Sequence, residues 1–139
     1  MAEVITGTPV VTGTARGEVL ATGQTISFWG GVDTETGKIV DPRHELFGQN
    51  IAGRILVFPY GKGSAAAPMV LLELARQNTA PAGMVNLETD PLLAAGPIIS
   101  SRFYGITVPV IRVGRRDFGK LKTGLHAVVD SCSGEIKLT

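Results

Sequence analysis

Short apolar runs that end at glycine or proline divide this chain into many small elements. The clearest is residues 51–58, whose second half is apolar throughout, and such a run predicts a strand buried on both faces. Residues 82–87 and 108–113 have the same character and predict two further buried strands. Residues 10–12 and 18–20 predict short strands near the N-terminus, where threonine and glycine surround the apolar positions.

Helical spacing of apolar residues predicts a helix over residues 68–77. A shorter helix is expected over residues 90–95, because Asp90 suits the N-cap and Pro91 suits the first helical position. Residues 97–104 fit either a helix or a loop. These helices alternate with the buried strands, which is the order expected when helices cover a sheet.

Residues 26–33 begin with the character of a strand end and then reach Gly30-Gly31, where the glycines permit a turn that other residues rarely adopt. Asp33 beside them fits either a turn residue or a contributor to a site. Shorter elements are expected at 39–40 (strand), 116–121 (helix), and 125–130 with 135–138 (a terminal hairpin). The whole pattern predicts one α/β or layered β/β/α domain over residues 1–139.

Composition and charge narrow the function classes. The chain has 139 residues, 44% of them hydrophobic, and 13 basic against 12 acidic residues give a net charge of +1. No run of Lys or Arg exceeds the pair Arg115-Arg116, which argues against nucleic acid and anionic membranes as partners. Neither a signal peptide nor a membrane-spanning run is visible, so a cytoplasmic protein is expected. With Cys132 alone and His44 and His126 far apart, no metal site is expected on this chain.

The segment Gly61-Lys62-Gly63-Ser64 joins a predicted strand to a predicted helix, an arrangement that suits anion binding at the helix start. It is not a phosphate-binding Walker loop, because Gly63 separates Lys62 from Ser64 and the required spacing fails. Ser64 fits either the N-cap of an ordinary turn or a reactive hydroxyl beside a lysine. Pro68 indicates that the helix starts near Ala67, which leaves Ser64 in the loop and favours the second interpretation. The chain shows no catalytic triad and no paired carboxylates, so as a free-standing enzyme it is incomplete.

Three segments together carry a resemblance to a known family. They are residues 26–39, which include Gly30-Gly31-Val32-Asp33; residues 48–64, which run into Gly61-Lys62-Gly63-Ser64; and residues 70–74 with Ala80-Pro81-Ala82. In this order and spacing the chain resembles the small subunit of aconitase X, a separate swivelling domain of the aconitase superfamily. The resemblance implies a β/β/α swivelling fold like the fourth domain of aconitase.

The resemblance also implies a heteromeric dehydratase, a hydro-lyase that is inactive until this chain meets its large subunit. That partner would carry iron or an iron–sulfur cluster, which acts as a Lewis acid on the leaving hydroxyl. Ser64 would be the general base that removes a proton next to the substrate carboxylate. The residues expected to bind substrate or support the loop are Gly61, Lys62, Gly63, Gly30, Gly31 and Asp33.

Two hydroxy-acid substrates are known in this family. The low charged fraction, 18%, favours a mesophilic bacterium and therefore cis-3-hydroxy-L-proline, which dehydration converts to Δ1-pyrroline-2-carboxylate. The alternative is (R)-5-phosphomevalonate, whose phosphate would need additional basic residues to bind it. The sequence shows no obvious set of such residues. A hypothesis of another class is a non-catalytic ligand-binding or regulatory domain with the same fold.

Overall fold

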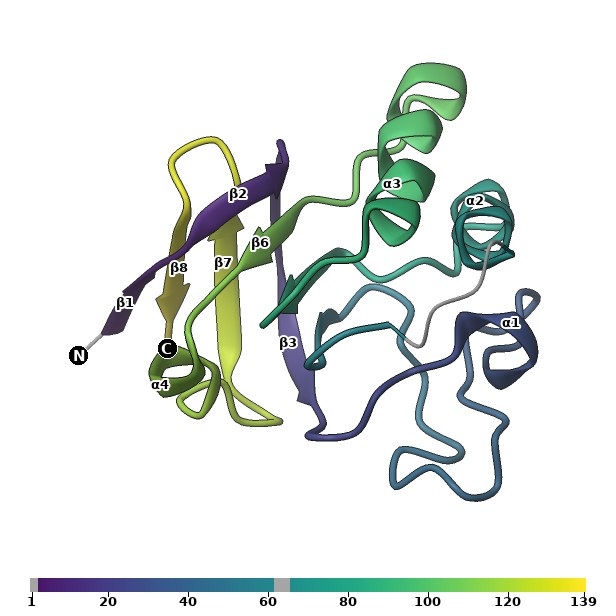
Figure 1. Cartoon of the computed structure of the whole chain (residues 1–139), viewed down its shortest axis with the longest axis horizontal. Helices are drawn as coiled ribbons and strands as arrows, with labels where there is room; N and C mark the ends of the chain where they lie inside the picture. The colour runs from purple at the N-terminus through teal and green to yellow at the C-terminus, as the bar shows by residue number, and fades with distance from the viewer. Residues whose placement is uncertain (1–2, 62–65) are drawn as a thin grey trace.

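The computed structural model of the chain describes residues 3–61 and 66–139 (Figure 1). Within these residues, eight strands form one sheet in the order β1-β8-β7-β3-β4-β5-β6-β2. The strands are β1 (Glu3–Thr6), β2 (Thr8–Val11), β3 (Thr14–Ala21), β4 (Ile55–Val57), β5 (Gly83–Asn86), β6 (Val110–Arg112), β7 (His126–Asp130) and β8 (Glu135–Leu138). The helices are α1 (Phe28–Gly31), α2 (Ala67–Arg76), α3 (Pro91–Tyr104) and α4 (Arg115–Phe118).

The sheet curls into a barrel-like shape because its two end strands are neighbours in the sequence. β1 and β2 stand at opposite ends of the strand order, yet only Gly7 separates them. A side chain at Gly7 would place its Cβ 2.5 Å from the carbonyl oxygen of Arg112, so the close approach requires glycine. The Gly7 N–H donates to the carbonyl of Gly134 at 2.7 Å, which fixes the junction next to the β7–β8 hairpin.

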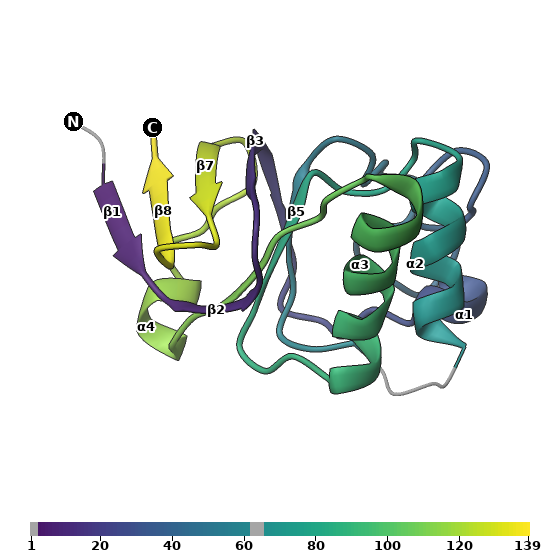
Figure 2. The same ribbon diagram turned by 90° about the horizontal axis from the view of Figure 1, so that it is seen from above.

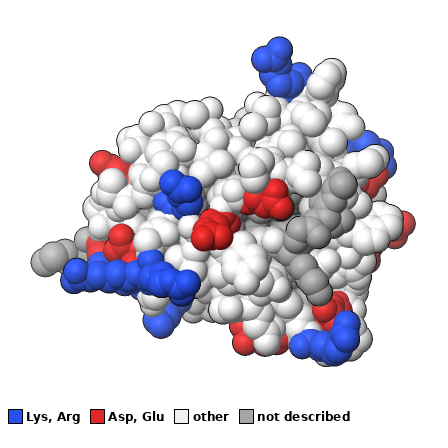
Figure 3. All heavy atoms as spheres, in the orientation of Figure 1, with Lys and Arg blue, Asp and Glu red and all other residues white. Residues whose placement is uncertain are grey.

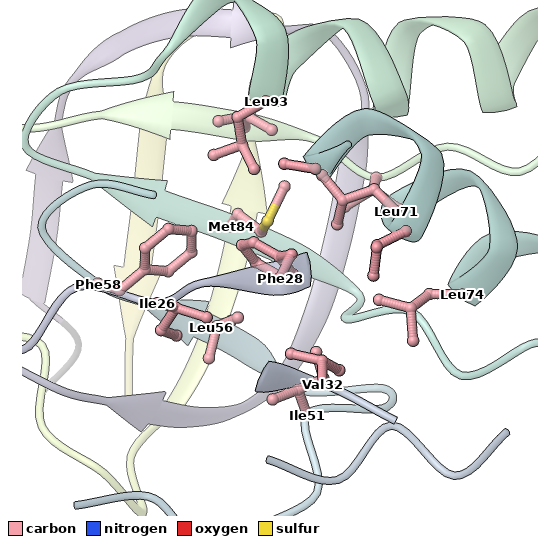
Figure 4. Close-up of a cluster of buried hydrophobic side chains, with 14 of the residues drawn as sticks. Ile26, Phe28, Val32, Ile51, Leu56, Phe58, Leu71, Leu74, Met84 and Leu93 are labelled. Carbon is pink, nitrogen blue, oxygen red and sulfur yellow. The ribbon is translucent and has the colours of Figure 1, made fainter. Parts of the chain in front are cut away.

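The four central strands, β3 to β6, run parallel. β4 and β5 are buried on both faces, as their apolar runs predict, whereas β3 is fully buried only at Val19 and Leu20 and β6 is exposed at Arg112. Because successive side chains of a strand point to opposite faces of the sheet, each strand contributes side chains to two separate cores. One core lies between the sheet and the helices and includes Leu20, Leu56, Met84 and Val110 (Figure 4). The other lies inside the barrel and includes Val19, Ile55, Val85 and Ile111.

Helices α2 and α3 form a layer over the outer face of the parallel strands, on the side away from β1, β8 and β7 (Figure 2). They approach closely at Gly96, where an added Cβ would lie 2.9 Å from Leu71 Cβ and 3.2 Å from the Pro68 carbonyl oxygen. The chain therefore has two sheet layers and one helix layer, and the predicted layered β/β/α class is confirmed. The helix predicted over residues 68–77 is α2, one residue earlier at each end.

The ambiguous residues 97–104 are helical, and α3 continues through Pro97 to Tyr104. A proline inside a helix removes one backbone hydrogen bond, which is why the sequence favours an end at this point. Here Pro97 is buried, and packing of α3 against α2 outweighs the lost bond. The Ser100 hydroxyl contacts the carbonyls of Pro97 and Ile106 at 3.0 and 2.9 Å, and Gly105 caps the helix with a φ of +66°.

Two other segments differ from the sequence-based expectation. Residues 39–40, expected as a strand, contribute only an isolated bridge between Val32 and Ile39. Residues 28–31 form the single turn α1, in which Trp29 and Gly30 have non-helical backbone angles. The glycine pair therefore does permit a turn, as predicted, but the preceding residues are not part of a named strand.

Candidate active site

The parallel strands β3 to β6 end at one common edge of the sheet, because strands that run the same way have their carboxyl ends together. This edge is where open α/β sheets bind ligands. The segments that leave it follow Ala21, Val57, Asn86 and Arg112, the last residues of the four strands. The glycine loop predicted from the sequence begins at Gly61, four residues beyond β4, and so belongs to this edge.

Gly61 is held between two elements that are distant in the sequence. It forms a parallel bridge with Ile26, which precedes α1. A Cβ built on Gly61 would lie 3.7 Å from the δ carbons of Leu93, in the first turn of α3. The start of the loop is therefore fixed by the segment before α1 on one side and by α3 on the other.

Lys62, Gly63 and Ser64 lie outside the residues that the structure describes. The described chain resumes at Ala66, which is the N-cap of α2, and Pro68 follows at the second helical position. Ser64 precedes this N-cap by two residues, as the position of Pro68 predicts. The start of α2 carries a partial positive charge next to the end of the loop, since the aligned peptide dipoles of a ten-residue helix point that way.

Gly30 and Gly31 lie in α1, which packs against α2. Gly30 has a φ of +79°, a left-handed conformation that disfavours other residues. The carbonyl of Gly31 accepts a hydrogen bond from the N–H of Val40 at 2.9 Å. Both glycines line a polar hollow of ≈ 370 Å³, together with Ser27, Trp29, Val40, Asp41, Pro42 and Arg43.

Asp33 uses both of its carboxylate oxygens within its own turn. Oδ1 accepts from the Glu35 N–H and Oδ2 from the Thr36 hydroxyl, each at 3.0 Å. The Asp33 N–H donates to the carbonyl of Lys38 at 2.9 Å. Asp33 therefore orders the turn that follows α1, and the structure records no contact between Asp33 and the described part of the glycine loop. A role of Asp33 in binding substrate stays a prediction.

Asn86 ties two of the edge segments together, and the sequence reasoning missed it. Its side chain is fully buried at the end of β5; Nδ2 donates to the Phe58 carbonyl at 3.1 Å, and Oδ1 accepts from the Thr89 hydroxyl at 3.1 Å. Asn86 thereby fixes the segment after β4, which leads to Gly61, to the segment after β5. The only signal in the sequence was a polar residue within an apolar run.

A second hollow of the carboxyl edge has a volume of ≈ 230 Å³ and brings a basic side chain close to the glycine loop. Tyr60, directly before Gly61, lines it together with Leu87, Glu88, Val113, Gly114 and Arg115. The structure records no ion pair for Arg115 within the described residues. The sequence reasoning missed this residue because Arg115 and Tyr60 are 55 positions apart in the sequence.

Comparison with known proteins identifies the family. The model of the aconitase X swivel domain matches residues 4–138. The chain belongs to this family. The crystal structure of Thermococcus kodakaraensis aconitase X in its holo-form resembles the swivel domain with a TM-score of 0.89 and 40% sequence identity, over 99% of this chain and 98% of that one.

Curated relatives of the swivel domain carry a functional name. The phosphomevalonate dehydratase small subunit of Methanococcoides burtonii is 40% identical over 93% of this chain and 90% of its own length. The protein of the same name from Thermococcus kodakarensis is 42% identical over 95% of this chain and 93% of its own length. The expectation of a dehydratase subunit agrees with these names.

The described part of the swivel domain offers no metal centre of its own. Residues 3–61 and 66–139 contain no group of three or more His, Cys, Asp or Glu side chains that could hold an ion. The expectation that iron or an iron–sulfur cluster resides on a large subunit stays a prediction. No helix among the same residues is long and apolar enough to cross a membrane.

Proposed function

We propose that this chain is the small subunit of a phosphomevalonate dehydratase, which removes water from (R)-5-phosphomevalonate at an active site completed by a large subunit. One observation carries the proposal: relatives 40–42% identical over 93–95% of the chain bear this name. These names favour the second of the two expected substrates over cis-3-hydroxy-L-proline. A hydroxyproline substrate has no comparable support.

In this proposal Ser64 is the general base. Its alkoxide takes a proton from the carbon next to the substrate carboxylate, and the hydroxyl on the following carbon leaves with its bonding electrons, so that a carbon–carbon double bond forms. The proton held by Ser64 then passes to the departing hydroxide, which completes the water molecule and restores the alkoxide. A free serine is a very weak base, and the anion needs stabilisation by several kcal/mol. We expect two groups to supply this stabilisation. They are the start of α2, three residues beyond Ser64, and the side chain of Lys62.

Other residues of the edge fix the start of the loop that carries this base. Ile26 and Leu93 fix Gly61 at the start of the loop, and Asn86 fixes the preceding segment. A catalytic group must lie within a fraction of an ångström of its productive position, so such anchors matter for turnover. An iron-bearing group on the partner would supply Lewis-acid chemistry for the leaving hydroxyl.

Arg115 supports a phosphorylated substrate. Arg115 lines the same hollow as Tyr60, the residue before Gly61, and an arginine side chain can bind two phosphate oxygens at once. Strands β4 and β6 are separated by β5, so the segments after them are about 10 Å apart. Five bonds separate the reacting carbon of phosphomevalonate from its phosphorus. The arginine side chain covers the rest of the distance between the two segments. Glu88 lines the same hollow, and its carboxylate would repel the substrate phosphate. Replacing Glu88 with an uncharged residue should therefore strengthen the binding of phosphomevalonate.

The test is turnover of both substrates by the chain co-expressed with a large subunit from the same organism. We expect dehydration of phosphomevalonate and none of cis-3-hydroxy-L-proline; the reverse result would reject the proposed substrate. Arg115→Gln should raise KM for phosphomevalonate about tenfold or more, since a lost charged hydrogen bond costs about 1.5–3 kcal/mol. Arg116→Gln is the matched control, because Arg116 is also exposed but does not line the hollow.

A further inference from the structure

The segment between β3 and α1 provides the backbone against which Gly61 lies. Residues 22–26 run from the end of β3 towards α1 (Figure 1). The Thr22 N–H donates to the Val57 carbonyl at 2.9 Å, which extends the pairing of β3 with β4. At the other end of the segment, Ile26 forms the parallel bridge with Gly61. The position of Gly61 therefore depends on what holds residues 22–26 in place.

Three hydrogen bonds attach this segment to the loop that follows α1, and together they are here called the clasp. They join His44 Nε2 to the Thr25 carbonyl at 3.0 Å, the Glu45 N–H to Gln24 Oε1 at 2.9 Å, and the Thr22 hydroxyl to the Glu45 carboxylate. Leu46, the next residue along the loop, is buried in the core beneath the helices. The clasp is therefore anchored on its loop side as well as on its strand side.

Long-range attraction between charges contributes little to this attachment. On the face shown in Figure 3, acidic and basic side chains lie in small groups with uncharged surface between them. Exposed charges at such separations are also screened by salt. The loop is therefore held against residues 22–26 by the short, directional hydrogen bonds of the clasp.

The partners of His44 determine which ring nitrogen carries the proton. The Leu46 N–H can only donate, and its nitrogen lies 3.0 Å from Nδ1, so Nδ1 accepts. The Thr25 carbonyl can only accept, so Nε2 carries the proton and donates to it. Because both ring nitrogens are bonded to backbone groups, the ring is not free to exchange a proton with a substrate. It fixes the Thr25 backbone, directly before Ile26.

We propose that His44 is a positioning residue of the active site. Its neutral ring, protonated on Nε2, holds Thr25 and thereby the bridge between Ile26 and Gly61. This inference rests on the proposed function, since the position of Gly61 matters for turnover only if the loop that it begins is catalytic. The control of Gly61 by His44 is a property of the chain itself, and it can be measured without turnover.

Two substitutions separate the contributions of the two ring nitrogens. In His44→Gln, the amide nitrogen is as many bonds from Cβ as the Nε2 of histidine, so it can still donate to the Thr25 carbonyl. In His44→Asn, the amide oxygen can replace Nδ1 as acceptor for the Leu46 N–H, but the shorter side chain does not reach Thr25. His126→Asn is the matched control, because His126 is exposed and its side chain makes no hydrogen bond within the described residues.

The first measurement is nuclear magnetic resonance of the full chain at about pH 8. The ring nitrogens of His44 should show the tautomer with the proton on Nε2, and the opposite tautomer would overturn the inference. Both His44 variants lose the aromatic ring, so its magnetic effect on neighbouring amides is lost equally in both. The amide resonances of Ile26 and Gly61 should move further in His44→Asn than in His44→Gln, and should not move in His126→Asn. Equal movement in the two His44 variants would overturn the inference.

The second measurement is phosphomevalonate turnover by the assembled complex, below the unfolding midpoint of each variant. His44→Asn should lower kcat about tenfold, since a misplacement of about 1 Å can cost about 100-fold. KM should change less than about twofold, because His44 contacts only backbone groups of its own chain. His44→Gln should keep kcat within about twofold of the wild type.

The outcomes separate this inference from the proposed function. An equal loss of kcat in His44→Gln and His44→Asn would overturn the positioning role in favour of chemistry by the ring itself. Wild-type kcat in His44→Asn would also overturn it. If the wild-type complex does not dehydrate phosphomevalonate, the proposed function fails, and the resonances of Ile26 and Gly61 still decide whether His44 positions Gly61.

Discussion

Gly96→Ala tests whether the close contact between α3 and α2 contributes to the stability of the fold. The new Cβ would lie 2.9 Å from Leu71 Cβ, where ordinary contacts begin at 3.4 Å, so α3 must withdraw by about 0.5 Å (3.4 − 2.9). Overpacking of a core in this way costs about 1–3 kcal/mol. The better helix propensity of alanine returns about 1 kcal/mol. We therefore expect a net loss of about 1 kcal/mol.

For a domain of 139 residues, this loss corresponds to a decrease of about 3 °C in the thermal unfolding midpoint. The assay is thermal unfolding followed by circular dichroism. Ser101→Ala is the control, because Ser101 is exposed on the same helix and the change alters helix propensity without a new contact. We expect it to leave the midpoint unchanged or slightly raised. A midpoint for Gly96→Ala at or above the wild type would refute the reasoning, since propensity alone would then account for the result.

Three further predictions concern other residues of the fold. Asn86→Leu should lower the free energy of unfolding by about 1–3 kcal/mol in urea denaturation, because a buried carbonyl and hydroxyl lose their partner; an unchanged value would contradict its bridging role. Gly30→Ala should cost about 1–2 kcal/mol by the same assay and Gly30→Asn less, since the position needs a positive φ although its surroundings are open. Backbone N–H groups of Cys132 and Ser133 hold the pKa of Asp130 below its ordinary value, so its carboxylate contributes stability that is present at neutral pH and is lost as the pH falls through that lowered pKa. Asp130→Asn should therefore flatten the decline in unfolding midpoint below about pH 4, and an unaltered pH profile would count against the assignment.

The elements that the sequence predicts well are those whose signal is local. The apolar run around β4 and the helical spacing of α2 are both contained in about ten residues, and both elements occur where expected. The sequence is ambiguous over the second half of α3, since a proline such as Pro97 normally ends a helix, and packing against α2 explains why it does not do so here. β1 was not predicted, since its pairing with β8 joins Glu3 to Leu138 across nearly the whole chain.

The candidate site shows the same division. Gly61 and the segment that contains Gly30 could be singled out individually, because glycines beside apolar runs are visible in the sequence. Their proximity could not, since it depends on the bridge between Ile26 and Gly61. Arg115 escaped notice for a similar reason: it meets Tyr60 only because β4, β5 and β6 end at the same edge.

The central claim is that Ser64 supplies the base for a dehydration shared between two subunits. The most direct test is turnover of phosphomevalonate by the assembled complex that carries Ser64→Ala, with Ser101→Ala as the matched serine control. We predict that Ser64→Ala lowers kcat by about 10²–10⁴-fold while the affinity for the large subunit and the thermal midpoint stay those of the wild type. Turnover close to the wild-type rate in an intact complex would contradict the claim and would favour a non-catalytic role for this domain.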